Sequence, residues 1–165
     1  MGSFINALYV ALFVLLLFFV SSTTKKKNEE LRGNIAKGKF IYYKDFEKDW
    51  ISAKAGRRGI AGYKYNDGTG CYIITIYSTP VIQDYMSYEN VYVGQSVKMC
   101  QRVHNHFTGK GKGDIYADIK YGKYVYVRLV PCAKEEMNAL EKQLIRAFNS
   151  TNSYNATVGG GKRRY

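Results

Sequence analysis

Cysteine is scarce in this sequence: there are three in 165 residues, and no two of them form a Cys-x-x-Cys pair. An odd, widely spaced set argues against a disulfide framework and against a zinc site. Cys71, Cys100 and Cys132 each stand among apolar or strand-forming residues. We therefore expect buried, reduced thiols in a reducing compartment.

Acidic side chains and histidines are also few. The chain has 13 Asp and Glu against 25 Lys and Arg, which gives a net charge of +12 and a pI near 9.5. The excess is spread along the chain, since residues 21–69 and residues 70–165 each carry +6. This balance indicates an acidic partner, either nucleic acid or an anionic membrane surface, or else a solvated basic surface with no specific partner. The only histidines, His104 and His106, lie two positions apart.

Charge is absent from residues 4–20, FINALYVALFVLLLFFV, and Lys25, Lys26 and Lys27 follow. The run is at the short end of the length that spans a bilayer as a helix. The alternative is a signal peptide that is cleaved to give a secreted protein, but no basic residue precedes the run and Ser21 and Ser22 make a poor cleavage site. Because positive residues favour the cytoplasm, we expect a single-pass membrane anchor that contacts lipid and leaves residues 25–165 in the cytoplasm.

After this anchor or signal segment, residues 1–24, the chain divides into a basic lead-in and one folded domain. An apolar content of 46% is enough for a core. Residues 25–69 are predicted to be a basic tether and lead-in, with a glycine-rich basic turn at 55–62 and an Asp-Gly turn signal in 63–70. Residues 70–160 are predicted to form the domain, and residues 161–165 a basic tail.

Three short segments within the domain are rich in β-branched and aromatic residues and predict strands at 70–77, 89–93 and 124–130. Gly94 closes the second and Pro131 the third. Residues 134–149 carry the clearest helical pattern, and residues 115–122 predict one or two helical turns. We expect an α+β (α/β) fold with a small three-stranded antiparallel sheet flanked by helices, preceded by one N-terminal transmembrane helix.

A further helix is predicted after Ser96, which is a suitable cap. Apolar residues recur at helical spacing and are expected to face the core: Val97, Cys100, Val103 and Phe107. Three basic or titratable residues recur at i, i+4 and i+8 and are expected to form one stripe on another face: Lys98, Arg102 and His106.

Glu141 is unusual on the 134–149 helix because it borders the apolar stripe of that helix. The stripe consists of Met137, Leu140, Leu144 and Phe148. A carboxylate in this position loses hydration and seldom lies there without a partner. The functional interpretation is a metal ligand or a base in a cleft, and the alternative is an exposed glutamate beside Lys142.

Together these motifs resemble the GIY-YIG nuclease family over residues 70–160. Residues 70–72, Gly-Cys-Tyr, stand where the family has Gly-Ile-Tyr, and residues 92–94, Tyr-Val-Gly, where it has Tyr-Ile-Gly. Arg102 has the family's arginine spacing, and His106 fits a histidine that many members carry. Glu141 lies in a segment that looks like the one with the metal-binding glutamate, and Asn155 looks like a late asparagine. The gap between the two tyrosine motifs is longer than usual and indicates an insertion at residues 79–88.

The resemblance implies hydrolysis of phosphodiester bonds at one divalent cation, Mg²⁺ or Mn²⁺, held by Glu141. Arg102 then binds phosphate oxygens with a planar cationic fork. Tyr72 and Tyr92 present hydroxyls, with Tyr72 as the expected proton acceptor and His106 as the second choice. Asn155 is expected to order this group through hydrogen bonds. His104 has no counterpart in the family and is predicted to be a surface histidine.

The predicted partner is nucleic acid, with DNA as the expected substrate. Four lysines are expected to hold its backbone: Lys98, Lys110, Lys112 and Lys120. The sequence has no separate module that reads bases. Two other functions remain open: a non-catalytic nucleic-acid-binding module on the membrane, and a membrane-associated scaffold whose basic segment 25–58 binds anionic lipid.

Overall fold

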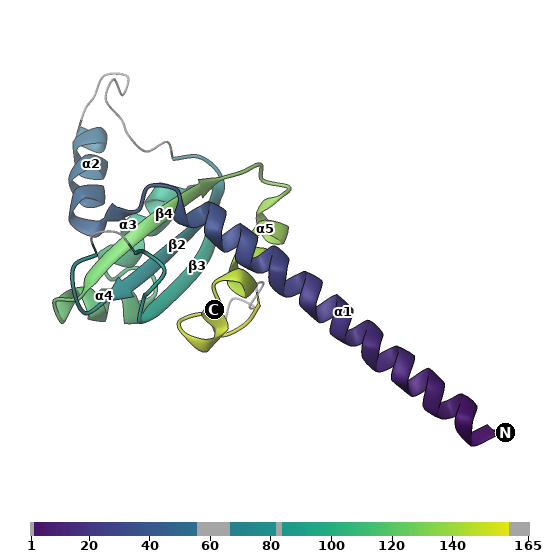
Figure 1. Cartoon of the computed structure of the whole chain (residues 1–165). Helices are drawn as coiled ribbons and strands as arrows, with labels where there is room; N and C mark the ends of the chain where they lie inside the picture. Colours follow the sequence, from purple (N-terminus) through teal and green to yellow (C-terminus); the bar gives the residue numbers. More distant parts are fainter. Residues whose placement is uncertain (1, 56–66, 82–83, 159–165) are drawn as a thin grey trace.

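The central feature of the computed structural model is a four-stranded antiparallel sheet, within a structure that describes residues 2–55, 67–81 and 84–158 (Figure 1). The strands are β1 Ile41–Tyr42, β2 Gly70–Tyr77, β3 Asn90–Ser96 and β4 Tyr124–Pro131. Their order is β1-β4-β2-β3, so β2 is central and β3 is an edge strand. The predicted α+β class, with an antiparallel sheet flanked by helices, is confirmed.

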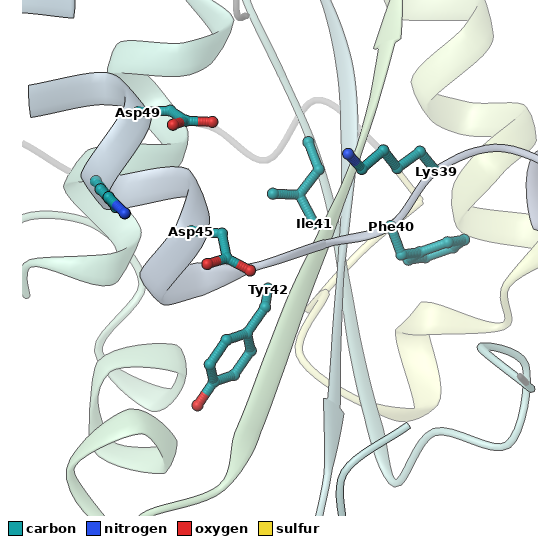
Figure 2. Close-up of a pocket in the computed structure, with 7 residues that line it drawn as sticks. Lys39, Phe40, Ile41, Tyr42, Asp45 and Asp49 are labelled. Atoms are coloured by element: carbon teal, nitrogen blue, oxygen red, sulfur yellow. The ribbon is translucent and has the colours of Figure 1, made fainter. Parts of the chain in front are cut away.

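The prediction of three strands is wrong because the lead-in adds β1. Ile41 pairs with Val127 and Tyr42 with Tyr126, and two residues are too few to show the alternation that predicts a strand. Helix α2, Tyr43–Ala55, follows at once. A pocket of about 230 Å³ lies between this strand and the first turns of α2, and Figure 2 shows the residues that line it. None of the predicted site residues lines it.

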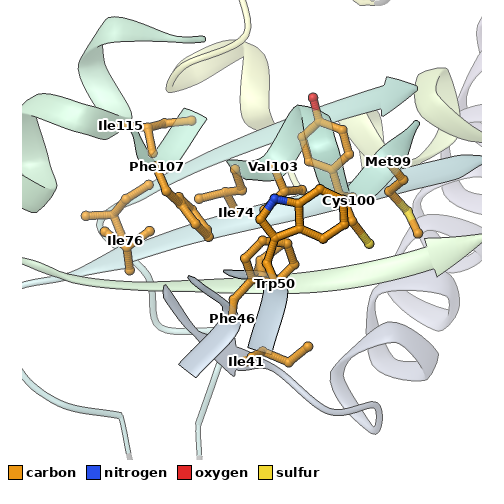
Figure 3. Packing of buried hydrophobic residues seen from close by; sticks show 13 residues of the cluster. Ile41, Phe46, Trp50, Ile74, Ile76, Met99, Cys100, Val103, Phe107 and Ile115 are labelled. Carbon is orange, nitrogen blue, oxygen red and sulfur yellow. The ribbon is translucent and has the colours of Figure 1, made fainter. Parts of the chain in front are cut away.

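The sheet separates two apolar cores because successive side chains of a strand point to opposite faces. Helices α2, α3 (Met99–Phe107) and α4 (Gly113–Lys120) cover one face. Figure 3 shows this core, in which Phe46 and Trp50 of α2 pack with Val103 and Phe107 of α3. Helix α5, Met137–Ala147, and the C-terminal end of helix α1, Gly2–Ala36, cover the other face. The lead-in therefore contributes side chains to both cores.

Helix α1 continues through the segment that the sequence predicted to be a tether. Its last turns pack on the second core, where Ile35 is buried and Arg32 donates a hydrogen bond to the carbonyl of Met86 at 2.9 Å. Across the described parts of the chain, no helix combines the length and the apolar content needed to cross a membrane. The transmembrane helix predicted from residues 4–20 therefore has no support from the fold.

Most of the other predicted elements are present, with shifted ends. Strand β2 has the predicted bounds. Helix α4 overlaps the turns predicted at 115–122 but runs from Gly113 to Lys120, and α5 begins at Met137 instead of residue 134. Strand β3 does not stop at Gly94, since Gly94 pairs with Tyr72 and Ser96 with Gly70. Helix α3 consequently starts later than predicted, and Val97 is exposed instead of buried. Residues 56–62 of the glycine-rich turn, residues 63–66 of the next turn segment and the basic tail 161–165 lie outside the described residues.

The insertion predicted at residues 79–88 connects β2 to β3 and packs on the α1–α5 side of the sheet. Tyr85 stacks on Phe40 with ring centroids 4.7 Å apart. The Tyr88 hydroxyl donates to the carbonyl of Phe148 at 2.9 Å. The connection begins after Tyr77, about 17 Å along β2 from Tyr72. It therefore lies at the opposite end of β2 from Tyr72, whereas it joins β3 close to Tyr92.

Candidate active site

Two tyrosines and one histidine meet on the α3 face of the sheet. Tyr72 of β2 lies opposite Gly94 of β3, and His106 comes from the last turn of α3. The Tyr72 hydroxyl and His106 Nε2 are 2.9 Å apart. The ring centroid of Tyr92 is 5.0 Å from that of His106 and 6.3 Å from that of Tyr72. Tyr72 and His106 are fully buried, and Tyr92 is half-buried.

Gly94 makes the position of Tyr72 possible. A Cβ atom on Gly94 would lie 2.4 Å from the Tyr72 hydroxyl oxygen, which is well inside van der Waals contact. The ring of Tyr72 therefore occupies the space that a side chain at position 94 would need. This packing is a physical reason for glycine at the end of the Tyr-Val-Gly motif.

The tautomer of His106 follows from its two hydrogen bonds. The backbone N–H of Lys112 donates to His106 Nδ1 at 2.8 Å, so Nδ1 is an acceptor and carries no proton. Burial, with the nearby charges of Arg102 and Lys112, lowers the pKa of His106 to about 3. The ring is therefore neutral near pH 7, its proton is on Nε2, and Nε2–H donates to the Tyr72 hydroxyl oxygen.

The basic loop after α3 closes over His106. A Cβ atom on Gly111 would lie 2.5 Å from His106 Nδ1, so glycine is needed for the loop to approach the ring. The predicted surface stripe on this helix is therefore wrong for His106, which points into the protein, whereas Lys98 and Arg102 are exposed. His106 is buried because it contacts Tyr72 in the sheet and Lys112 in the following loop. Helical spacing gives no information about either contact.

Arg102 and Glu141 both act on the two phenols electrostatically. Burial raises the pKa of Tyr72 well above its usual value; the charges of Tyr92 and Glu141 add to this effect, and the Arg102 guanidinium opposes it. Burial likewise raises the pKa of Tyr92, against the effect of Arg102. Both hydroxyls therefore hold their protons at neutral pH, and additional positive charge at this site favours their release.

Glu141 reaches this group from the opposite face of the sheet. It lies on α5, which covers the second core, whereas Tyr72 and Tyr92 point to the α3 side. The two sides meet at the edge strand β3, where Gln95 Nε2 donates to Glu141 Oε2 at 3.0 Å. Burial raises the pKa of Glu141, against the effects of the Gln95 hydrogen bond and the Lys142 charge. The candidate site is thus a surface around the Gly94–Gln95 edge and not a cavity within one layer.

The residues at this edge fit a hard, well-hydrated divalent cation. Glu141 supplies a half-buried carboxylate, and the adjacent Gln95 Oε1 is buried without a hydrogen-bond partner. Among the described residues, no three His, Cys, Asp or Glu side chains converge on a common point. One carboxylate with neutral oxygens suits Mg²⁺ or Mn²⁺, which keep several waters, better than it suits zinc.

Asn155 acts on the backbone of the Tyr-Val-Gly segment. Its Oδ1 accepts from the N–H of Val93 at 2.9 Å, and its Nδ2 donates to the carbonyl of Val93 at 2.8 Å. The amide thus occupies the free edge of β3 as a neighbouring strand would. Asn155 therefore fixes Tyr92 and Gly94 through the residue between them, and it is a positioning residue.

The four predicted phosphate-binding lysines differ in their surroundings. Lys98 and Lys110 are exposed. Lys112 Nζ lies 3.0 Å from Asp114 Oδ2, and Lys120 Nζ lies 5.3 Å from the centre of the Tyr116 ring. Helix α3 carries Arg102, and three of the lysines lie next to this helix: Lys98 directly before it, and Lys110 and Lys112 in the loop after it. These three are therefore the lysines best placed near the candidate site.

Sequence reasoning missed three contributions to this region. Gln95 contacts Glu141, the Lys112 backbone N–H fixes the tautomer of His106, and Glu47 binds His104 with an oxygen–nitrogen distance of 2.8 Å. His104 is therefore a link between α3 and the lead-in helix α2, and not a free surface histidine. Of the three, only Gln95 left a signal: it is an amide in the buried row that also contains Val91 and Val93.

The comparisons with known proteins agree with the motifs. Residues 69–155 match the GIY-YIG catalytic domain. Neither the curated proteins nor the solved structures gave a match. The matched range includes all the predicted catalytic residues, which are Tyr72, Tyr92, Arg102, His106, Glu141 and Asn155. It does not include β1 or α2.

Proposed function

The chain belongs to the GIY-YIG family, a nuclease family, and from that premise we propose that it is a metal-dependent endonuclease that hydrolyses phosphodiester bonds in DNA. The observation that carries the proposal is the buried hydrogen bond between Tyr72 and a neutral His106, beside Arg102 and across the sheet edge from Glu141. A buried phenol next to a cationic side chain and a carboxylate fits proton transfer at a phosphate better than it fits core packing.

Tyr72 is the proposed proton acceptor from the attacking water. The Nε2–H of His106 points at the Tyr72 oxygen and stabilises it when it becomes negative. His106 itself is a poor acceptor, because Nδ1 already accepts from Lys112 and Nε2 already holds a proton. We therefore rank Tyr72 first and give His106 the role of donor.

Arg102, and the divalent cation that Glu141 would hold, are proposed to neutralise charge on the phosphate. Arg102 presents an exposed guanidinium on α3 that can bind two phosphate oxygens. Glu141, with Gln95 beside it, would hold the divalent cation, which when bound stabilises developing negative charge and the leaving oxygen. Tyr92 is half-buried against His106, and its proposed role is to donate a hydrogen bond to the substrate.

The proposal is tested by a nicking assay with the purified full-length chain. We expect supercoiled DNA to be nicked with Mg²⁺ or Mn²⁺, and cleavage to stop when the metal is chelated and to return when it is added back. A parallel single-stranded RNA substrate tests the choice of DNA. Salt-sensitive DNA binding with no turnover under any metal condition would contradict the enzyme and favour the non-catalytic nucleic-acid-binding module.

Membrane tethering through residues 4–20, with the domain in the cytoplasm, is also proposed. The support is the uncharged apolar run followed by Lys25, Lys26 and Lys27. Deletion of residues 1–24 keeps Arg32 and Ile35, which contact the rest of the fold. We expect the full chain in the membrane fraction after an alkaline wash and the deletion variant in the soluble fraction. Recovery of both in the soluble fraction would contradict the anchor, and a mature N-terminus near residue 23 outside the cell would favour secretion.

A further inference from the structure

Gln95 is the residue whose contacts the family motifs do not explain. It follows the Tyr-Val-Gly segment on β3 and continues the row of Val91 and Val93 that packs toward α5. Its Nε2 donates both to Asn138 Oδ1 at 2.7 Å and to Glu141 Oε2 at 3.0 Å. Both acceptors lie on α5, so the amide nitrogen connects the edge strand to the helix that carries the carboxylate.

The oxygen of the same amide has no partner. Gln95 Oε1 is buried and accepts no hydrogen bond. The contact with Glu141 fixes the orientation of the amide, since an ionised carboxylate requires the nitrogen to face it. Buried carbonyl oxygens are nearly always satisfied, so one left open beside a carboxylate calls for an ion or a water.

The separations suit one small cation shared by the two side chains. The nitrogen and oxygen of an amide are about 2.3 Å apart. Since Nε2 is 3.0 Å from Glu141 Oε2, Gln95 Oε1 lies within roughly 5 Å of that oxygen. Two oxygens on one Mg²⁺ are about 3 Å apart when adjacent and about 4 Å apart when opposite. A small side-chain rotation therefore brings Gln95 Oε1 and a Glu141 oxygen onto the same ion.

We propose that Gln95 is a second protein ligand, through Oε1, to the divalent cation held by Glu141, while its Nε2–H keeps the carboxylate in place. The proposal rests on the proposed nuclease function and adds a ligand to its cation site. Asn138 fixes the amide from the other side and is a positioning residue. Solvent reaches the pair from the side of Glu141, which is half-buried.

The test counts the waters on a bound metal ion. Eu³⁺ serves as the probe in the full chain, because its luminescence lifetimes in H₂O and D₂O report the number of coordinated waters. Gln95→Met keeps the length of the side chain but removes the amide, and we expect one more bound water than in the wild type. Mn²⁺ affinity, measured by electron paramagnetic resonance, should fall about tenfold to a hundredfold. Gln143→Met is the matched control on the exposed face of α5 and should change neither value.

A second variant keeps the test decisive where Gln95→Met folds poorly. Gln95→Glu places a carboxylate at the same point and is expected to tighten Mn²⁺ binding about tenfold with the water count unchanged. An unchanged water count in folded Gln95→Met, or no tightening in Gln95→Glu, would overturn the role of Gln95.

Glu141→Gln separates this inference from the function on which it rests. We expect Glu141→Gln to lose Mn²⁺ binding. If it does and the Gln95 variants bind as the wild type does, only the role of Gln95 is wrong. If Glu141→Gln binds Mn²⁺ as tightly as the wild type, the cation site of the proposed nuclease is wrong as well.

Discussion

Replacement of Glu141 by alanine is expected to lower Mg²⁺-dependent DNA cleavage about a thousandfold or more. In the described parts of the chain, no group of three or more His, Cys, Asp or Glu side chains is arranged to hold a metal ion in its place. A metal ion contributes several kcal/mol to stabilising a phosphoryl transition state, and about 4 kcal/mol corresponds to a thousandfold in rate. The measurement is single-turnover nicking of supercoiled DNA at saturating Mg²⁺.

The stability of a Glu141 variant should change in the opposite direction to its activity. Burial raises the pKa of Glu141 in the folded state, so the ionised form of this carboxyl group weakens folding. The stability that its protonated form contributes is complete below the unfolded pKa and is lost as the pH rises through the folded pKa. Glu141→Gln is therefore expected to unfold at a higher temperature than the wild type at pH 7 without metal, and the difference should shrink at acidic pH.

Two further measurements make the Glu141 result specific. Glu135→Gln is the matched control, since Glu135 is exposed near the same helix, and it should cleave at the wild-type rate. DNA binding in the presence of a chelator should survive in Glu141→Ala, because lysines and Arg102 supply that affinity. Cleavage by folded Glu141→Ala within tenfold of the wild-type rate would rule out Glu141 as the metal ligand.

The sequence predicts the parts of the fold whose signals are local. Strand β2 is rich in β-branched and aromatic residues and α5 has an apolar stripe, so the ranges found are close to those expected. Strand β1 has two residues and exists because β4 offers a partner. The lead-in helix α2 joins the core through Phe46 and Trp50, and a charged segment without a clean period does not reveal that contact.

The site shows the same division between local and distant causes. Motif spacing identifies Tyr72, Tyr92, Arg102 and Glu141 as candidates, and the structure brings their charges within reach of one another. Spacing gives neither the burial of His106 nor its tautomer, since both depend on the loop that Gly111 allows to close. These contacts change the expected chemistry, because they make His106 a hydrogen-bond donor.

Tyr72→Phe is expected to lower the cleavage rate by about a hundredfold to ten-thousandfold, the usual contribution of a positioned proton acceptor. The matched control is Tyr77→Phe on the same strand, since Tyr77 is also buried and also bonds through its hydroxyl, to the Tyr85 carbonyl at 2.7 Å. Each variant loses one hydrogen bond, which is buried in Tyr72→Phe and partly buried in Tyr77→Phe, and such a loss costs about 1–3 kcal/mol of stability. Only the Tyr72 variant should lose activity at a temperature where both are folded.

The pH dependence of cleavage distinguishes Tyr72 from His106 as the acceptor. Burial raises the pKa of Tyr72 well above its usual value. At any pH below that pKa, an increase of one pH unit makes the reactive phenolate tenfold more abundant. The wild-type rate should therefore keep rising toward alkaline pH. The pKa of His106 is lowered to about 3, so its protonation adds no step between pH 5 and 9. In Tyr72→Phe the slope should flatten. A wild-type rate that levels off near pH 7, together with activity in Tyr72→Phe, would assign the proton transfer to His106. An imidazole that titrates near pH 7 could not be held in the tautomer that the Lys112 N–H fixes.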